Sequence, residues 1–213
     1  MKIAILTSAN QWFVPYSKEL NNQLNDSKLF FNHKEIDDSF SIVFILSYHS
    51  LIEEEYLKLH KHNIVIHESD LPKGKGWAPM SWQVLENKDN IVFSMFEAGL
   101  GIDDGNIYMR QSLQLTGNEL NAELRYKQAQ FSINMCIEFI ENYTNYKNPL
   151  KQKGNETFYK KRTKEDSELD INKTINEQFN LLRIVDNKDY PAFFYKNNKK
   201  YLIKIEEDKN ENR

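Results

Sequence analysis

One histidine and one aspartate stand out because each lies where a predicted strand gives way to an irregular turn. His67 ends the predicted strand of residues 63–67, and a loop punctuated by proline and glycine follows it over residues 68–79. Asp103 begins an Asp-Asp-Gly turn. An imidazole can donate a hydrogen bond to a developing oxyanion, and a carboxylate can orient that imidazole or accept a proton. The pair could serve an addition to a carbonyl group; a structural histidine and a simple turn aspartate are the plainer alternatives.

Alternating apolar runs and helical patterns must position these side chains. Strands are predicted over residues 2–8, 41–48, 63–67, 90–96 and 107–115. Helices are predicted over residues 16–24, 51–60, 78–85 and 119–143. In the second helix, four residues are expected to be buried: Leu51, Tyr56, Leu57 and Leu59. This order of elements predicts an α/β fold whose sheet is parallel in its first half.

The predicted sheet brings two loops to one edge. Open α/β sheets bind ligands outside the carboxyl ends of their strands. Ser47-Tyr48-His49-Ser50 follows the strand 41–48, and His67 ends the neighbouring strand. We therefore expect both loops to open into the same crevice.

The chain changes character after the long helix. Residues 145–155 are polar and are predicted to form a linker. A helix over residues 173–185 and a hairpin of residues 191–195 and 201–205 are predicted to follow, before a charged, frayed end at residues 206–213. We predict a catalytic core of residues 1–146 and a C-terminal extension of residues 147–213, whose apolar strands could mediate a homodimer.

Composition excludes several classes of protein. The net charge of -3 gives no basic field for nucleic acid, and no apolar run approaches the roughly 18 residues of a membrane span. The first residues are too short an apolar run for a signal peptide. The only cysteine, Cys136, lies on a helical pattern and is expected to be a buried thiol; no metal-ligand spacing occurs. A cytoplasmic protein without a metal or a membrane partner is expected.

Two motifs resemble a known family. Residues 67–79, His-Glu-Ser-Asp-Leu-Pro-Lys-Gly-Lys-Gly-Trp-Ala-Pro, resemble the His-x-Ser-x-Leu-Pro-x-x-x-Gly-x-x-Pro signature of formyltransferases that use 10-formyltetrahydrofolate. Residues 102–107 resemble the Asp-x-Gly turn of that family. The resemblance implies a Rossmann-like core, with a small helix and hairpin as the C-terminal extension.

The tail carries a second resemblance. Residues 161–167, 180–183 and 190–194 follow in an order similar to the tail of sugar-nucleotide N-formyltransferases. The sequence of residues 68–77 most resembles the corresponding segment of enzymes that formylate amino-sugar precursors of nonulosonic acids such as pseudaminic acid. The resemblance implies a nucleotide-linked amino sugar as the acceptor of the formyl group. It leaves open which sugar, which amine, and whether the nucleotide is UDP or dTDP.

The resemblance also implies roles for single residues. His67 and Asp103 match the family's catalytic histidine and aspartate. The loops that line the folate pocket in the family match Ser47, Tyr48, His49, Leu51, Ile52, Ile102 and Asp103. Residues expected to bind the nucleotide sugar through charge, hydrogen bonds or stacking are Lys73, Lys75, Trp77, Arg162, Asn180, Arg183 and Tyr190. Surface solvation or core packing is the alternative for each of this last group.

One position departs from the family pattern. An asparagine that contacts the formyl oxygen usually stands two residues before the histidine, where this chain has Val65. Asn63 shares that face of the strand but lies roughly 7 Å farther back. Either His67 acts with water alone, or another donor such as Ser69 takes part.

The sequence leaves open two other acceptors and one alternative without catalysis. Glycinamide ribonucleotide or methionyl-tRNA could be the acceptor, although the acidic balance and the tail disfavour them. Since Val65 replaces the family asparagine, the chain could also be an inactive folate- or nucleotide-binding protein.

Overall fold

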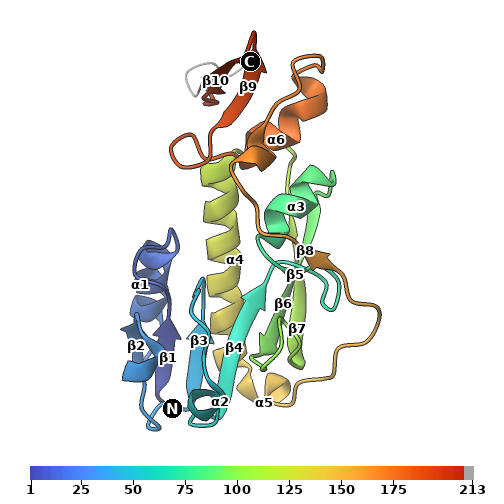
Figure 1. Cartoon of the computed structure of the whole chain (residues 1–213). Helices are drawn as coiled ribbons and strands as arrows, with labels where there is room; N and C mark the ends of the chain where they lie inside the picture. Colours follow the sequence, from blue (N-terminus) through green and yellow to red (C-terminus); the bar gives the residue numbers. More distant parts are fainter. Residues whose placement is uncertain (209–213) are drawn as a thin grey trace.

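A six-stranded sheet forms the centre of the computed structural model, which describes residues 1–208 (Figure 1). Its strands in spatial order are β2 (Ser27–Phe30), β1 (Ile3–Leu6), β3 (Ile42–Ile45), β4 (His62–His67), β6 (Asn90–Glu97) and β7 (Ile107–Gln114). The first four run parallel, and β6 and β7 are antiparallel to their neighbours. The predicted α/β fold with a mainly parallel sheet is confirmed.

The apolar runs explain which strands lie at the centre. Every residue of β1 and β3 is buried, as expected of parallel strands covered on both faces. By contrast, β7 is exposed at alternate positions in its second half, as suits the strand at the sheet edge. The strand β2 was not predicted, because Ser-Lys-Leu-Phe carries too little apolar patterning to separate it from a loop.

Three helices pack against one face of the sheet. They are α1 (Val14–Gln23), α3 (Pro79–Leu85) and α4 (Asn121–Glu141), and α4 is the longest (Figure 1). Met135 and Phe139 of α4 are fully buried in the main hydrophobic cluster. Cys136 is a buried free thiol, as expected, and burial raises its pKa. Within residues 1–208, no helix combines the length and apolar character that crossing a bilayer requires.

The short helical pieces differ most from the prediction. The elements are α2 (Glu54–Leu57), α5 (Tyr143–Tyr146) and the 3-10 turns η1 (His33–Glu35), η2 (Glu165–Ser167) and η3 (Asn176–Gln178). The helix predicted over residues 51–60 therefore shrinks to one turn. Leu51 is 89% exposed and Leu59 is also exposed, so their predicted burial was wrong. Tyr56 and Leu57 are half-buried.

The C-terminal extension combines expected and unexpected elements. The helix α6 (Phe179–Ile184) and the antiparallel pair β9 (Ala192–Lys196) and β10 (Lys199–Ile203) match the predicted helix and hairpin. Asn197 and Asn198 both have positive φ, which a two-residue hairpin turn requires. The predicted linker instead leads to β8 (Phe158–Tyr159), which pairs with β5 (Lys75–Gly76) of the core. The boundary at residue 146 stays a prediction, and the expected fraying of residues 209–213 lies outside the described residues.

Candidate active site

His67 occupies the carboxyl end of β4, near the middle of the sheet. Its side chain is almost fully buried, and Nε2 lies 2.8 Å from the carbonyl oxygen of Gly74. A carbonyl can only accept a hydrogen bond, so Nε2 carries the proton and Nδ1 bears the lone pair in the neutral ring. The hydrogen bond to Gly74 therefore fixes the tautomer of the ring.

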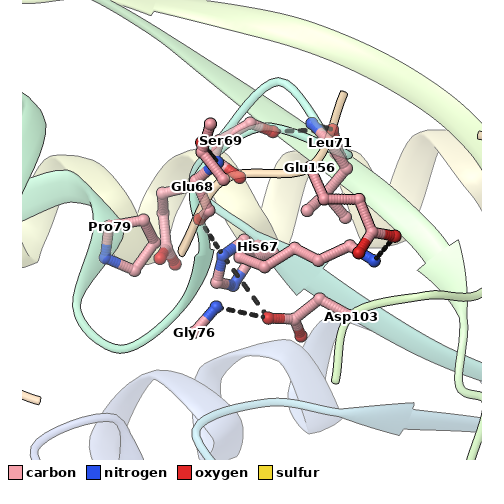
Figure 2. Close-up of polar contacts among 12 residues, drawn as sticks. His67, Glu68, Ser69, Leu71, Gly76, Pro79, Asp103 and Glu156 are labelled. Carbon is pink, nitrogen blue, oxygen red and sulfur yellow. Dashed lines mark hydrogen bonds and ion pairs between the residues drawn. The ribbon is translucent and has the colours of Figure 1, made fainter. Parts of the chain in front are cut away.

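Asp103 faces the same imidazole from the loop between β6 and β7. Its Oδ2 lies 3.7 Å from His67 Nε2 and accepts a 2.8 Å hydrogen bond from the backbone N–H of Gly76 (Figure 2). Asp103 adopts a left-handed conformation with φ of 48°, which aspartate tolerates better than most residues. The structure thus brings together the two residues that the sequence singled out.

Two glycines make this arrangement possible. Gly74 and Gly76 have φ of 70° and 98°, in the region that favours glycine. A Cβ at Gly76 would lie 2.5 Å from the carbonyl oxygen of Tyr159, and one at Gly74 would lie 2.8 Å from the Tyr159 ring. The loop that carries both anchoring groups is therefore pressed against β8, and only glycine fits at these two positions.

Glu68 is a carboxyl group beside His67 that the sequence analysis did not single out. Its side chain is half-buried and accepts a 2.7 Å hydrogen bond from Gln128 of α4. Burial raises the pKa of Glu68, and the neighbouring His67 opposes that rise. The sequence did contain a signal for this residue, because Glu68 directly follows the histidine that ends the strand.

Glu68→Gln should stabilise the protein at neutral pH. Because the folded pKa lies above the unfolded one, Glu68 favours folding when protonated, and that contribution is lost as pH rises through the folded pKa. The neutral amide can still accept from Gln128. We expect a gain of up to about 1 kcal/mol at pH 7 and almost none at pH 4, measured by urea unfolding. The exposed Glu55→Gln is the control, and equal effects of Glu68→Gln at both pH values would contradict the prediction.

The loop after β3 contacts the loop after His67. His49 stacks on Trp77 with ring centroids 6.0 Å apart, and burial, aided by the charge of Lys161, lowers the pKa of His49. The Tyr48 hydroxyl hydrogen-bonds to His33, and Ile52 packs on the apolar cluster behind β1 and β3. Ser47 starts this loop with φ of 52°.

Two of the predicted folate-pocket residues, and Trp77 of the predicted sugar-binding residues, present apolar surface to solvent. Leu51 is 89% exposed and Ile102 is 65% exposed, and Trp77 is exposed as well. The backbone N–H of Gly76 donates a hydrogen bond to Asp103. Trp77 is the next residue after Gly76, and Ile102 directly precedes Asp103. Exposed apolar side chains therefore flank the His67–Asp103 pair on more than one loop.

The three residues that could replace the missing asparagine differ in what their side chains contact. Val65 packs on the apolar clusters beside β4. The side-chain amide of Asn63 donates to the carbonyl of Leu57, away from His67. The hydroxyl of Ser69 is buried without a hydrogen-bond partner among the described residues.

Two of the predicted substrate cations are not free to meet a phosphate. Lys75 is 2% exposed, and its ammonium lies 2.6 Å from Glu156. Arg183 is 1% exposed and lies 3.0 Å from Glu119, while Asn180 accepts from the same guanidinium. The expectation that Lys75 and Arg183 bind a diphosphate is therefore corrected: each neutralises a carboxylate that is distant in sequence.

The remaining predicted substrate residues lie on exposed or half-buried segments. Lys73 is exposed, and Tyr190 is partly exposed. Arg162 is half-buried, with Nε unpartnered among the described residues, and burial lowers its pKa. Lys161, which was not predicted, places its ammonium 4.8 Å from the centre of the Trp77 ring.

Two cavities in the described residues lie elsewhere. The larger, of about 560 Å³, lies between α1, the start of α4 and the tail, and includes Trp12, Tyr16 and Arg125 in its lining. The other, of about 360 Å³, is lined by residues of the extension around Leu169 and Tyr195. His67 and Asp103 line neither. Residues 1–208 also contain no cluster of three or more His, Cys, Asp or Glu that could hold a metal ion.

Sequence comparison links the chain to formyltransferases. Methionyl-tRNA formyltransferase of Clostridium beijerinckii is 25% identical over 184 residues, which are 85% of this chain and 59% of that protein. The enzyme of the same name from Thermosipho melanesiensis is 33% identical over 144 residues, 67% of this chain and 46% of that protein. The chain thus spans less than two thirds of these curated relatives. No family model matches it.

Solved structures share the fold over nearly the whole chain. Methionyl-tRNA formyltransferase from Clostridium thermocellum superposes with a TM-score of 0.81 at 19% identity, covering 99% of this chain and 95% of the other. A 4-N formyltransferase from Francisella tularensis gives 0.75 at 16% identity, covering 98% of each. HypX from Aquifex aeolicus, solved with tetrahydrofolic acid, gives 0.77 at 15% identity, covering 96% of this chain and 37% of HypX. By its sequence relatives, the chain belongs to the formyltransferase family.

Proposed function

We propose that the protein is an N-formyltransferase that moves a formyl group from 10-formyltetrahydrofolate to an amine. The observation that carries the proposal is the separation of 3.7 Å between His67 Nε2 and Asp103 Oδ2 at the edge of the sheet. Both side chains are largely buried, so their charges act in a medium of lower dielectric than water.

The residues around this pair suit a reduced folate. Leu51, Trp77 and Ile102 are exposed apolar side chains on neighbouring loops, as expected of a surface for the aromatic parts of a folate. When bound, 10-formyltetrahydrofolate would supply the formyl group.

His67 would stabilise the negative charge on the formyl oxygen, and Asp103 would accept the proton of the attacking amine. The protonated imidazole would donate a hydrogen bond to the formyl oxygen, where negative charge develops as the amine attacks. Asp103 would hold the imidazole and accept the proton that the attacking nitrogen loses, directly or through water. The amine nitrogen would form the new C–N bond, and the bond from the formyl carbon to N10 of the folate would break. The proton that Asp103 accepted would then pass to N10, directly or through water.

We propose a nucleotide-linked amino sugar as the acceptor. The order of the tail motifs supports this choice. A protein described as a sugar N-formyltransferase from Shewanella sp FDAARGOS_354 shares the fold over 96% of this chain and 97% of that chain, which is compatible with it. Because Lys75 and Arg183 are paired internally, the diphosphate would have to be met by Lys73, Lys161 or Arg162. The sequence of residues 68–77 favours one specific acceptor, an amino-sugar precursor of a nonulosonic acid such as pseudaminic acid.

A second acceptor has support of its own. The two curated relatives described above are named for methionyl-tRNA, so the aminoacyl end of that RNA is the alternative. The net charge of -3 provides no general basic field toward RNA, which favours the sugar.

A panel of acceptors would separate these proposals. The protein and 10-formyltetrahydrofolate are incubated with UDP- and dTDP-linked amino sugars, glycinamide ribonucleotide or methionyl-tRNA. Mass spectrometry then detects the replacement of N–H by N–CHO, and absorbance follows release of tetrahydrofolate. Transfer to a nucleotide sugar supports the proposal, and transfer to methionyl-tRNA alone would replace the proposed acceptor.

A further inference from the structure

The segment between the core and the C-terminal helix touches both loops of the candidate site. Residues 150–159, called the strap here, follow α5 and pass beside β7 before they pair with β5 (Figure 1). Leu150 exchanges two backbone hydrogen bonds with Ile107, at 2.7 and 2.8 Å. The strap is therefore anchored to the sheet directly after the turn that carries Asp103.

Gln152 of the strap holds that turn. Its side-chain nitrogen donates to the carbonyl oxygens of Asp103 at 2.7 Å and of Gly105 at 2.8 Å, which uses both of its hydrogens. Its own oxygen, Oε1, is buried without a partner among the described residues. One amide thus closes the turn around Asp103, although its oxygen remains unsatisfied.

The far end of the strap holds the loop after His67. Thr157 accepts from the N–H of Gly74 through Oγ1 at 2.8 Å and from the N–H of Lys75 through its carbonyl at 2.9 Å. Glu156 pairs with the buried ammonium of Lys75 at 2.6 Å. The two neighbours of Lys75 in the chain hydrogen-bond to the candidate catalytic side chains. The Gly74 carbonyl accepts from His67, and the Gly76 N–H donates to Asp103.

We propose that the strap sets the distance between His67 and Asp103, and that Gln152 and Thr157 are positioning residues for formyl transfer. This inference rests on the proposed function. The two side chains come from separate loops and lie 3.7 Å apart, beyond hydrogen-bond length, so a small shift of either loop would change their alignment. The strap is the segment that bonds both loops. A misplacement of about 1 Å can lower a rate by about 100-fold, so the expected effect falls on turnover.

Gln152→Ala tests the first contact. We expect kcat to fall by about 10- to 100-fold, while KM for donor and acceptor changes by less than about twofold. The matched control is Gln114→Ala, because Gln114 is exposed and donates to the neighbouring Leu115 carbonyl outside the site. Thr157→Val is the milder second variant. It keeps the shape of the side chain and removes only the acceptor for Gly74, so it remains informative if Gln152→Ala fails to fold.

A readout that needs no acceptor separates the strap from the proposed function. Ring-nitrogen NMR signals of His67 are assigned as those missing from His67→Asn. In Gln152→Ala they should move in the same direction as in Asp103→Ala, and in Gln114→Ala they should stay. If the wild type transfers no formyl group yet these shifts appear, the proposed function fails, while the claim that the strap positions His67 against Asp103 stands. If Gln152→Ala lowers the unfolding temperature but leaves kcat and the His67 signals unchanged, the strap contributes only to stability and the inference is overturned.

Discussion

Replacing His67 by asparagine should lower kcat by about 100- to 1,000-fold while the protein stays folded. Asparagine keeps a donor but cannot take up or release a proton near neutral pH. Loss of one donor to an oxyanion typically costs a factor of this size. Asp103→Ala should cause a loss of at least about 100-fold, because it removes the proton acceptor. Steady-state kinetics with the best acceptor of the panel, beside thermal unfolding of each variant, would measure both effects.

Asp103→Asn is the control that separates chemistry from loop geometry. The amide oxygen can still accept from the Gly76 N–H, so the loop keeps its anchor while the negative charge is lost. If charge is what matters, Asp103→Asn is about as slow as Asp103→Ala. Rates near those of the wild type in His67→Asn or Asp103→Asn, in protein that unfolds normally, would contradict the roles assigned here.

Arg183→Met should cause the largest loss of stability. The guanidinium is 1% exposed and donates to the Glu119 carboxylate, the Glu119 carbonyl and Asn180. Removing one partner of a buried ion pair costs about 3–5 kcal/mol. Lys127 still pairs with the Glu119 carboxylate, so here the loss comes from the buried acceptors that the guanidinium satisfied. For a chain of this size, that predicts an unfolding temperature lower by about 6–20 °C. The substitution touches neither His67 nor Asp103, so kcat of the folded variant should remain within about twofold.

The pH dependence of stability tests the surroundings of Glu119 separately from Arg183. Burial disfavours the charged Glu119, but hydrogen bonds from Lys127 and the backbone N–H of Thr116 outweigh burial and lower its pKa to about 2. A carboxyl with a lowered pKa stabilises the fold above its unfolded pKa, and this contribution is lost as pH falls from about 4.5 toward 2. Glu119→Gln should flatten the acid limb of the stability curve. An unchanged acid limb would contradict this account of the Glu119 pKa. Separately, a loss of acceptor binding with unchanged stability in Arg183→Met would favour the sequence-based role of Arg183.

The central strands could be predicted because their burial is local in the sequence. Four adjacent apolar residues form β1 and another four form β3, and each run is long enough to identify its strand. By contrast, β5 and β8 are two residues each and exist through pairing across the chain, with Lys75 opposite Phe158. No local pattern predicts such a pairing, so the sequence predicts only a linker over residues 145–155, which overlaps the first part of the strap.

The same distinction applies to the candidate site. His67 and Asp103 were recognisable from their motifs, and the structure places them face to face. Lys75 and Arg183 looked like free cations because their partners, Glu156 and Glu119, lie 81 and 64 residues away. Charge type is visible in a sequence, but burial and pairing depend on the tertiary fold. For this reason the juxtaposition of His67 and Asp103 was easier to predict than the surroundings of Lys75 and Arg183.

The most direct test of the account is formyl transfer itself, measured by mass spectrometry on nucleotide-linked amino sugars with wild-type protein and with His67→Asn. The account predicts that at least one sugar gains a formyl group on nitrogen, that tetrahydrofolate appears in equal amount, and that His67→Asn nearly abolishes both. Absence of transfer to every amino sugar in the panel, by folded protein with fresh donor, would contradict the proposed acceptor. Transfer that is equally fast in His67→Asn would contradict the site.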